Sequence, residues 1–305
     1  MNILKPQRLL LGDTIGVVAP SRHIFGNIER INKSIAYLRR CGFNVETGKH
    51  FKLRSYTSAG TPQERAEDIN TMFADKRIKA IFCALGGDAT NQILDLIDYR
   101  LIKENPKILI GYSDITFLLL AIYKKTGLIT YHGPGLTSFS NLTETSKKFT
   151  LDLLCGKTDK NFNFFSGGRV YKDGIASGPL IGGNLFVINS LGNTSYSLDF
   201  EKSILFWEDI DEGLGSIEFQ LYQLSLSGIL SRIAGMVIGH IKSGNKEKSR
   251  SVKEIILELT KEYKYPIIKV DHFGHGVKRF LTYPIGVEAK IDTANKFFKI
   301  YSSAV

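Results

Sequence analysis

The sequence contains little cysteine, and this shortage excludes several kinds of protein. Its 305 residues include three cysteines, which are far apart in the chain: Cys41, Cys83 and Cys155. Their odd number and wide spacing argue against a disulfide framework and match no zinc or redox motif. A His-Glu-x-x-His sequence is also absent, so we expect no metal. These features favour a reducing compartment, and we expect a cytoplasmic protein.

Signal segments, long apolar runs and nucleotide motifs are missing as well. Residues 1–6 lack the basic region and apolar core of a secretory signal, and no apolar run approaches the length of a bilayer span. No Gly-Lys-Ser/Thr follows Gly86-Gly87-Asp88, and no Gly-x-Gly-x-x-Gly follows a predicted strand. We therefore expect neither a membrane partner nor a nucleotide cofactor.

The charge of the chain is strongly positive, yet its pattern does not indicate nucleic-acid binding. The net charge is +10, and the densest cluster of lysines, residues 242–250, also holds glycine, serine and glutamate. Such a segment is typical of a solvated loop, and no basic stripe interleaved with aromatic residues occurs elsewhere. The positive charge can instead attract anionic substrates.

The first half of the chain alternates predicted strands and helices. Apolar runs predict strands that end near Ala19, Leu85 and Ile110, and helices are predicted over 28–40, from Thr61 onward and through 93–97. Thr61, Pro62 and Glu64 form a capping box at a helix start. The alternation indicates a parallel sheet with helices on both faces, and sites in such sheets lie beyond the carboxyl ends of the strands.

The second half is punctuated by glycine and is predicted to form a separate domain. The sequence is polar and irregular from about Thr143 to Lys172. We therefore predict a first domain over 1–150, a connector over 151–172 and a second domain over 173–305. Strands are expected at 203–207, 233–239 and 266–270, and helices near 216–227 and 252–263.

A candidate nucleophile lies between an apolar strand and an apolar helix. Gly111-Tyr112-Ser113 follows the strand and Thr116 begins the helix, which is the arrangement of a nucleophile elbow. The full motif ends in glycine, and Ile115 stands in that place. The alternative is that Ser113 or Asp114 only caps the helix. Cys83 is a weaker alternative nucleophile, because it lies inside a predicted strand.

A serine nucleophile needs a base, and the base needs an orienting group. His275 lies between two glycines after a predicted strand, and His272 is its nearest rival. A carboxylate at the end of an apolar strand must be paired or hydrogen-bonded, and Glu208 occupies such a place. The residue pattern alone leaves Glu208 and Glu212 as alternatives.

Several segments in order along the chain together resemble the LD-carboxypeptidase family of serine peptidases, which includes the microcin C immunity peptidases. The matching segments span nearly the whole chain: 12–21, 60–61 with Arg65, Asp68 and Asn70, 86–91, 110–116, 132–134, 182–185, 207–209, 274–276 and 284–286. Each segment is weak alone, and their number and order make the match specific.

The resemblance implies a fold and a site. It implies an N-terminal flavodoxin-like domain with Ser113 as nucleophile, and a smaller C-terminal mixed α/β domain of the swivelling type with Glu208 and His275. The implied oxyanion hole combines the N–H of Asp114 with a backbone N–H of the turn that holds Gly87 and Asp88. Family members are commonly dimers, so a homodimer is expected.

Family activity implies a small peptide or a peptide–nucleotide conjugate as substrate. One branch releases D-alanine from murein tetrapeptide, and the immunity branch cleaves an aspartyl-nucleotide conjugate. The loop after Gly183 lacks a tryptophan that could stack on adenine, which favours the murein peptide. Asn184 and Arg22 are candidate substrate-binding residues. A peptide-binding protein without catalysis is the alternative from another class.

Overall fold

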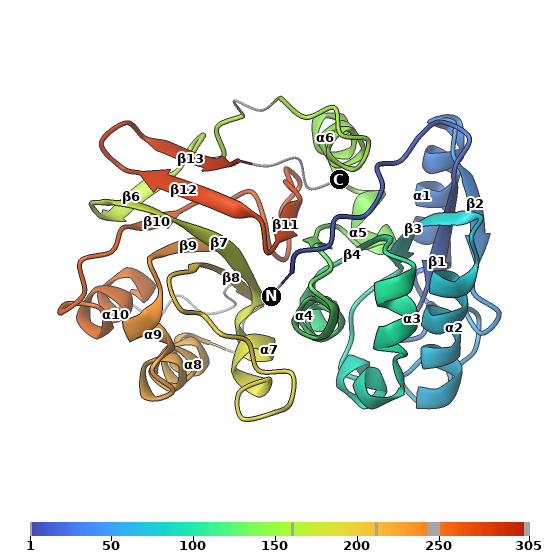
Figure 1. Ribbon diagram of the computed structural model, residues 1–305, viewed down its shortest axis with the longest axis horizontal. Helices are drawn as coiled ribbons and strands as arrows, with labels where there is room; N and C mark the ends of the chain where they lie inside the picture. Colours follow the sequence, from blue (N-terminus) through green and yellow to red (C-terminus); the bar gives the residue numbers. More distant parts are fainter. Residues whose placement is uncertain (1, 160–161, 211–212, 243–250, 302–305) are drawn as a thin grey trace. The chain divides into compact units, whose positions relative to one another are not determined.

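The computed structural model describes residues 2–159, 162–210, 213–242 and 251–301. The chain packs as two compact units, each built on one sheet (Figure 1). The first comprises Met1–Thr158 with Lys278–Ile285, and the second comprises Asp159–Val277 with Gly286–Ser302. The prediction of two α/β parts is confirmed, and the expected borders at 150 and 173 stay a prediction.

The sheet of the first unit is parallel except at one edge. Its strand order is β11-β5-β4-β3-β1-β2, and every neighbouring pair from β5 to β2 is parallel. The strands are β1 (Thr14–Val18), β2 (Asn44–Thr47), β3 (Ile78–Cys83), β4 (Ile108–Gly111), β5 (Thr130–His132) and β11 (Tyr283–Ile285). The order 2-1-3-4-5 is that of flavodoxin-like sheets, whose switch point lies between β1 and β3.

The sixth strand returns to this sheet from far along the chain. β11 pairs antiparallel with β5, so that Tyr283 lies opposite His132. Our sequence analysis assigned this segment to the second domain. Three residues of an edge strand carry little pattern of their own, and their partner in the sheet is decided by tertiary packing.

The helices of the first unit include three that the sequence predicts, over 28–40, from Thr61 onward and from Thr116 onward. The helices are α1 (Ile28–Arg40), α2 (Pro62–Ala74), α3 (Tyr99–Glu104), α4 (Thr116–Thr126), α5 (Leu136–Phe139) and α6 (Glu144–Leu154). In α1 the buried face includes Ile31, Ile35 and Leu38. The capping box of Thr61 and Glu64 at the start of α2 is confirmed.

One predicted helix differs in kind. Residues 90–96 form a 3-10 helix, η1 (Thr90–Leu96), with no side-chain cap at Ala89. Thr90 instead donates its hydroxyl and its backbone N–H to Asp114. These hydrogen bonds to a residue outside the helix hold the first turn of η1 in place.

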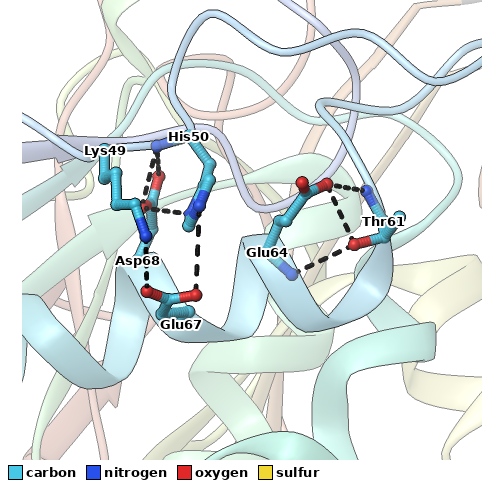
Figure 2. A network of polar contacts seen from close by, with 6 residues as sticks. All are labelled: Lys49, His50, Thr61, Glu64, Glu67 and Asp68. Carbon is cyan, nitrogen blue, oxygen red and sulfur yellow. Dashed lines mark hydrogen bonds and ion pairs between the residues drawn. The ribbon is translucent and has the colours of Figure 1, made fainter.

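A buried carboxylate anchors α2 to the segment after β2 (Figure 2). Asp68 accepts two hydrogen bonds from the backbone N–H of His50, and its Oδ1 lies 3.1 Å from His50 Nδ1. Burial raises the pKa of Asp68. Gly48 packs so closely over it that a Cβ there would lie 2.2 Å from Asp68 Oδ2. The neighbouring Glu67 makes an exposed ion pair with Lys49 at 3.2 Å.

The second unit contains a mixed sheet in the order β13-β12-β7-β8-β9-β10-β6. Its centre, β7 to β10, is parallel, and both edges are antiparallel. The strands are β6 (Arg169–Lys172), β7 (Ile175–Asn184), β8 (Ile204–Ile210), β9 (Gly235–Lys242), β10 (Ile267–Lys269), β12 (Glu288–Asp292) and β13 (Phe297–Ile300). The helices are α7 (Leu185–Ser190), α8 (Leu214–Leu226), α9 (Ile229–Arg232) and α10 (Val252–Leu259).

Glycine in β7 reflects close packing against β8. A Cβ at Gly182 would lie 1.7 Å from the carbonyl oxygen of Phe206, and one at Gly178 would lie 2.1 Å from that of Lys202. The glycine punctuation that marked this half of the sequence therefore belongs to a strand and its neighbour, and only partly to loops.

Residues 143–159 and 162–172 contain more regular structure than their sequence predicts. They contain α6, with Thr143 as the N-cap, and the edge strand β6. α6 buries polar residues such as Ser146 and Thr150 as well as leucines, so its buried face is hard to recognise from sequence. Within the described residues, no helix is both long enough and apolar enough to cross a membrane.

We expect Asp68→Ala to lower the stability of the first unit far more than Glu67→Ala. Asp68→Ala leaves a buried backbone N–H without its acceptor, which costs about 2–3 kcal/mol. Glu67→Ala removes the exposed ion pair with Lys49, worth less than about 1 kcal/mol, and a 3.9 Å contact with His50 Nε2, but it leaves no buried backbone N–H without an acceptor. Urea denaturation followed by circular dichroism measures both, and equal losses would contradict the assigned role of Asp68.

Candidate active site

Ser113 occupies a strained turn directly after β4. Tyr112 is extended, and Ser113 has a φ of 63°, in the left-handed region that residues other than glycine rarely adopt. The 3-10 turn η2 (Ser113–Ile115) and then α4 follow. The N-cap of α4 is Ile115, which makes no side-chain cap hydrogen bond, so the alternative of a capping serine is not the observed arrangement. This backbone path is that of a nucleophile elbow.

Two glycines leave room for this turn. A Cβ at Gly111 would lie 2.7 Å from Ile115 Cγ2, so Gly111 accommodates the isoleucine that stands where the motif has its last glycine. A Cβ at Gly86 would lie 3.1 Å from Ser113 Oγ and 3.4 Å from the backbone nitrogen of Asp114. Gly86 therefore keeps the space beside both atoms open.

The side chain of Asp114 ties three strand ends together. Its Oδ2 accepts hydrogen bonds from the backbone N–H groups of Ala89 and Thr90, at 3.1 and 2.9 Å. The hydroxyl groups of Ser21 and Thr90 donate to the same oxygen. Ser21 follows β1, residues 86–90 follow β3, and Asp114 follows β4. The ends of these three strands therefore meet at one carboxylate oxygen.

Arg65 supports the same loops from α2. It is 1% exposed, and its guanidinium donates to the carbonyl oxygens of Pro20 and Ala89, both at 2.8 Å, and to Gln92 at 2.7 Å. Burial lowers the pKa of Arg65, and the field of Asp114 acts in the opposite direction. Our sequence analysis gave Arg65 no role. The sequence could have indicated this role, because Arg65 has the helical spacing that places it on the same face of α2 as the buried residues Ile69 and Met72.

The loop after β3 carries the other residues predicted for the oxyanion hole. Gly87 lies against Ser21 and Arg22, because a Cβ there would lie 2.5 Å from Ser21 Oγ and 2.8 Å from Arg22 Cβ. Asp88 is exposed and forms an ion pair with Arg22 at 2.9 Å. The Arg22 guanidinium thus sits at the rim of this loop, within the same unit as Ser113.

Glu208 and His275 meet in the second unit. Glu208 is fully buried in β8, and its Oε2 accepts hydrogen bonds from His275 Nδ1 at 2.6 Å and from the His275 backbone N–H at 3.1 Å. Gly274 lies so close that a Cβ there would be 2.9 Å from Glu208 Cβ. With Nδ1 donating, Nε2 of His275 carries the lone pair that a base needs. The contact favours Glu208 over Glu212, which lies outside the described residues.

The rival residues of the sequence analysis occupy other surroundings. His272 is buried, and its Nε2 lies 2.6 Å from the carbonyl oxygen of Phe164, which is a structural contact. Cys83 is fully buried in β3, and burial raises the pKa of its thiol, which disfavours the thiolate. No group of three or more histidine, cysteine or acidic side chains within the described ranges is arranged to hold a metal ion.

Asn184 and Asp209 surround Glu208. The Nδ2 of Asn184 lies 3.3 Å from Glu208 Oε1 and 3.4 Å from Asp209 Oδ1. Asp209 Oδ2 accepts a hydrogen bond from Gln220 Nε2 at 2.9 Å. Burial, together with the negative charge of Glu208, raises the pKa of Asp209 to about 6. Asn184 is therefore engaged with two carboxyl groups of its own unit.

The structure brings the predicted residues together in two groups. Ser113, Asp114, the 86–88 turn and Arg22 belong to the first unit, and Glu208, His275 and Asn184 belong to the second. The joining of both groups in one catalytic site stays a prediction.

We expect Asp209 to make stability depend on pH. Its pKa is about 6 in the folded protein, whereas an unfolded aspartate titrates near pH 3.9. Between these values the unfolded chain loses its proton first, so this contribution destabilises the fold by about 3 kcal/mol as pH rises. Asp209→Asn lacks the effect. Denaturant unfolding at about pH 4 and pH 7 measures the free energy of unfolding of both proteins. The stability of Asp209→Asn relative to wild type should rise from pH 4 to pH 7, and an unchanged difference would contradict the prediction.

Comparison with known proteins identifies the family. The profile of the LD-carboxypeptidase N-terminal domain matches residues 15–133, and that of the C-terminal domain matches residues 177–291. A protein of Bacillus subtilis (strain 168) named "Probable murein peptide carboxypeptidase" is 35% identical over 96% of this chain and 92% of its own length.

Solved structures of two further proteins share the fold. The microcin C7 self-immunity protein MccF of Escherichia coli is 29% identical over 96% of this chain and 94% of its own length. A structure of MccF in complex with aspartyl sulfamoyl adenosine covers 98% of both chains with a TM-score of 0.89 and 27% identity. A muramoyltetrapeptide carboxypeptidase from Oxalobacter formigenes gives a TM-score of 0.79 and 25% identity over 91% of this chain and 94% of its own. By sequence and by fold, the chain belongs to the LD-carboxypeptidase family of serine peptidases.

Proposed function

We propose that this chain is a serine carboxypeptidase that releases the C-terminal D-alanine of murein tetrapeptide by cleaving an L,D-peptide bond. The observation that carries the proposal is the left-handed backbone of Ser113 at the elbow after β4. Family membership and the named activities of the relatives from Bacillus subtilis and Oxalobacter formigenes support the substrate class. The proposed enzyme acts in the cytoplasm as a homodimer and uses no cofactor.

The proposed reaction proceeds through an acyl-enzyme. Ser113 Oγ attacks the scissile carbonyl carbon while His275 Nε2 takes its proton, and Glu208 stabilises the resulting imidazolium. The C–N bond breaks as His275 returns the proton to the leaving amine of D-alanine. Water then attacks the ester by the same route in reverse, releasing the shortened peptide and restoring Ser113.

Backbone N–H groups stabilise the negative oxygen of both tetrahedral intermediates in this proposal. The donors are the N–H of Asp114 and an N–H of Gly87 or Asp88, beside the space that Gly86 leaves open. Removing one such donor typically costs about 3 kcal/mol of transition-state stabilisation. Because Asp114 Oδ2 fixes Ala89 and Thr90 next to this turn, the donors are held in place before substrate arrives.

Arg22 and Asn184 are the proposed substrate-binding residues. The Arg22 guanidinium is half-exposed and paired with Asp88. A substrate carboxylate can bind it in place of Asp88 or together with it. The Asn184 amide donates hydrogen bonds to Glu208 and Asp209. In this proposal it holds these carboxyl groups in place and also contacts the substrate. The net charge of +10 favours anionic murein peptides.

A second candidate substrate is an aspartyl-nucleotide conjugate. The shared fold with MccF in complex with aspartyl sulfamoyl adenosine supports this alternative. Trp207, the single tryptophan, is fully buried in β8 and offers no surface on which a nucleobase could stack. Phe186 in α7 is 59% exposed and offers an aromatic surface instead.

The first test is product analysis of wild type and Ser113→Ala. We expect wild type to release D-alanine from murein tetrapeptide, and Ser113→Ala to lose about 10⁶-fold in turnover because the nucleophile is gone. Mass spectrometry detects the products, and a parallel incubation with an aspartyl-adenylate conjugate tests the second candidate. Ser140→Ala, which removes a hydroxyl bonded to the Thr137 carbonyl, is the matched control.

Each outcome assigns the chain differently. Serine-dependent loss of D-alanine supports the murein peptidase. Serine-dependent release of the nucleotide alone moves the assignment to the immunity peptidases. Turnover that survives Ser113→Ala overturns the mechanism, and peptide binding without any product indicates a non-catalytic binding protein.

We expect Gly86→Ala to fold and to lose about 100-fold in kcat. Gly86 is not among the glycines with positive φ, so alanine fits the backbone. Its methyl group would lie 3.0 Å from Ser113 Cβ and displace the nucleophile by a fraction of an ångström, which is enough for such a loss. Gly215→Ala, where a Cβ meets nothing within 4 Å, is the control. Full activity in Gly86→Ala would argue against the assigned geometry.

A further inference from the structure

The second unit contains a buried carboxyl group for which the proposed reaction has no use. Asp209 follows Glu208 in β8 and is 3% exposed. Its Oδ1 accepts the backbone N–H of Ile210 at 2.8 Å, and its Oδ2 accepts Gln220 Nε2. Two carboxyl groups buried side by side repel each other when both are charged, so the state of one affects the other.

A strand irregularity allows both groups to reach one amide. Consecutive residues of a strand normally point to opposite faces. The register between β8 and β9 shifts between Trp207 and Asp209, and the Asn184 Nδ2 lies within 3.4 Å of an oxygen of both Glu208 and Asp209. Asn184 is itself fixed at the start of α7, where its Oδ1 accepts the N–H of Val187 at 3.3 Å.

We propose that Asp209 is a positioning residue that acts through Asn184 and Glu208 to orient His275 and to strengthen it as a base. The inference rests on the proposed function, because it takes Glu208 and His275 as members of the triad. Glu208 Oε2 accepts both hydrogen bonds from His275, so a change of charge or position at Glu208 reaches the imidazole directly. A second negative charge nearby favours the protonated ring.

Groups that hydrogen-bond to Asp209 are neutral and suit both of its charge states. Asn184 comes from the end of β7 and Gln220 from α8, where Ser216 lies beside it at 3.4 Å. The charged neighbour on β8 is Glu208, and His275 lies beyond it. Among the described residues, the buried Gln220 Oε1 has no hydrogen-bond partner. If this amide turned over, Gln220 Oε1 would accept a hydrogen bond from the protonated carboxyl group of Asp209.

The charge of Asp209 changes in the pH range where the enzyme would be assayed. Its pKa of about 6 means that it is mostly ionised at neutral pH and mostly neutral in mild acid. The predicted coupling is therefore strongest at neutral pH, where a general base is needed.

Nitrogen NMR of the imidazole rings tests the inference on the full-length protein without substrate. We expect the titration midpoint of His275 to fall by roughly 0.5 to 1 pH unit in Asp209→Asn, because a nearby negative charge is lost. His275→Gln assigns the signal. Asp199→Asn is the matched control, since its exposed carboxylate lies 3.7 Å from Arg232 and far less charge coupling is expected.

An unchanged His275 midpoint in folded Asp209→Asn overturns the inference. If that variant does not fold, Gln220→Met keeps the carboxyl group and removes a donor to its charged form. Asp209 then holds its proton to higher pH, and the inflection that Asp209 imposes on the His275 signal should move upward. The absence of any movement would also overturn the inference.

Activity supplies the readout that a merely structural role would not move. With murein tetrapeptide as substrate, the acid limb of kcat/KM should shift in Asp209→Asn by the same amount as the NMR midpoint. A uniform loss of activity with no shift of the limb overturns the inference. Since the titration needs no substrate, failure of the proposed peptidase activity and failure of the coupling are distinguished.

Discussion

One carboxylate oxygen, Oδ2 of Asp114, accepts the hydrogen bonds on which the loops around the elbow of the first unit depend. It accepts hydrogen bonds from Ser21, Ala89 and Thr90, and thereby joins the loops after β1 and β3 to the elbow after β4. Arg65 holds the same loops through the carbonyl oxygens of Pro20 and Ala89. The backbone N–H groups proposed for the oxyanion hole therefore lie next to loops that two buried side chains hold in place, which is the kind of fixed geometry that electrostatic preorganisation requires.

Both units contain buried carboxylates that are stabilised by hydrogen bonds. A charged group inside a protein is costly unless hydrogen bonds replace its water, and Asp68, Asp114 and Glu208 are each satisfied by backbone N–H groups together with a polar side chain. In each case the acceptor spans segments that are distant in sequence. The buried carboxylates thus fix backbone geometry where loops would otherwise be free to move.

Local patterns predicted the parts of this fold that depend on near neighbours. The alternation of strands and helices, the capping box at Thr61 and the turn at Ser113 could be recognised because each is encoded within a few residues. Arg65, Asp209 and β11 could not, because their roles follow from contacts with distant loops, a register shift between two strands and an edge pairing. Asp114 lies between these cases: its place in the turn was predicted, and the four hydrogen bonds to its side chain were not.

The return of β11 to the first sheet has a consequence for how the protein is made. On the ribosome, β1 to β5 emerge long before residues 283–285, so β5 must wait through the synthesis of β6 to β10 with one edge unpaired. An unpaired strand edge is prone to association with other chains. A fragment that ends at Thr158 would keep this edge permanently, although it contains Ser113 and the loops that Asp114 joins to it. The proposed nucleophile, Ser113, is therefore synthesised early, and the sheet that carries it is completed late.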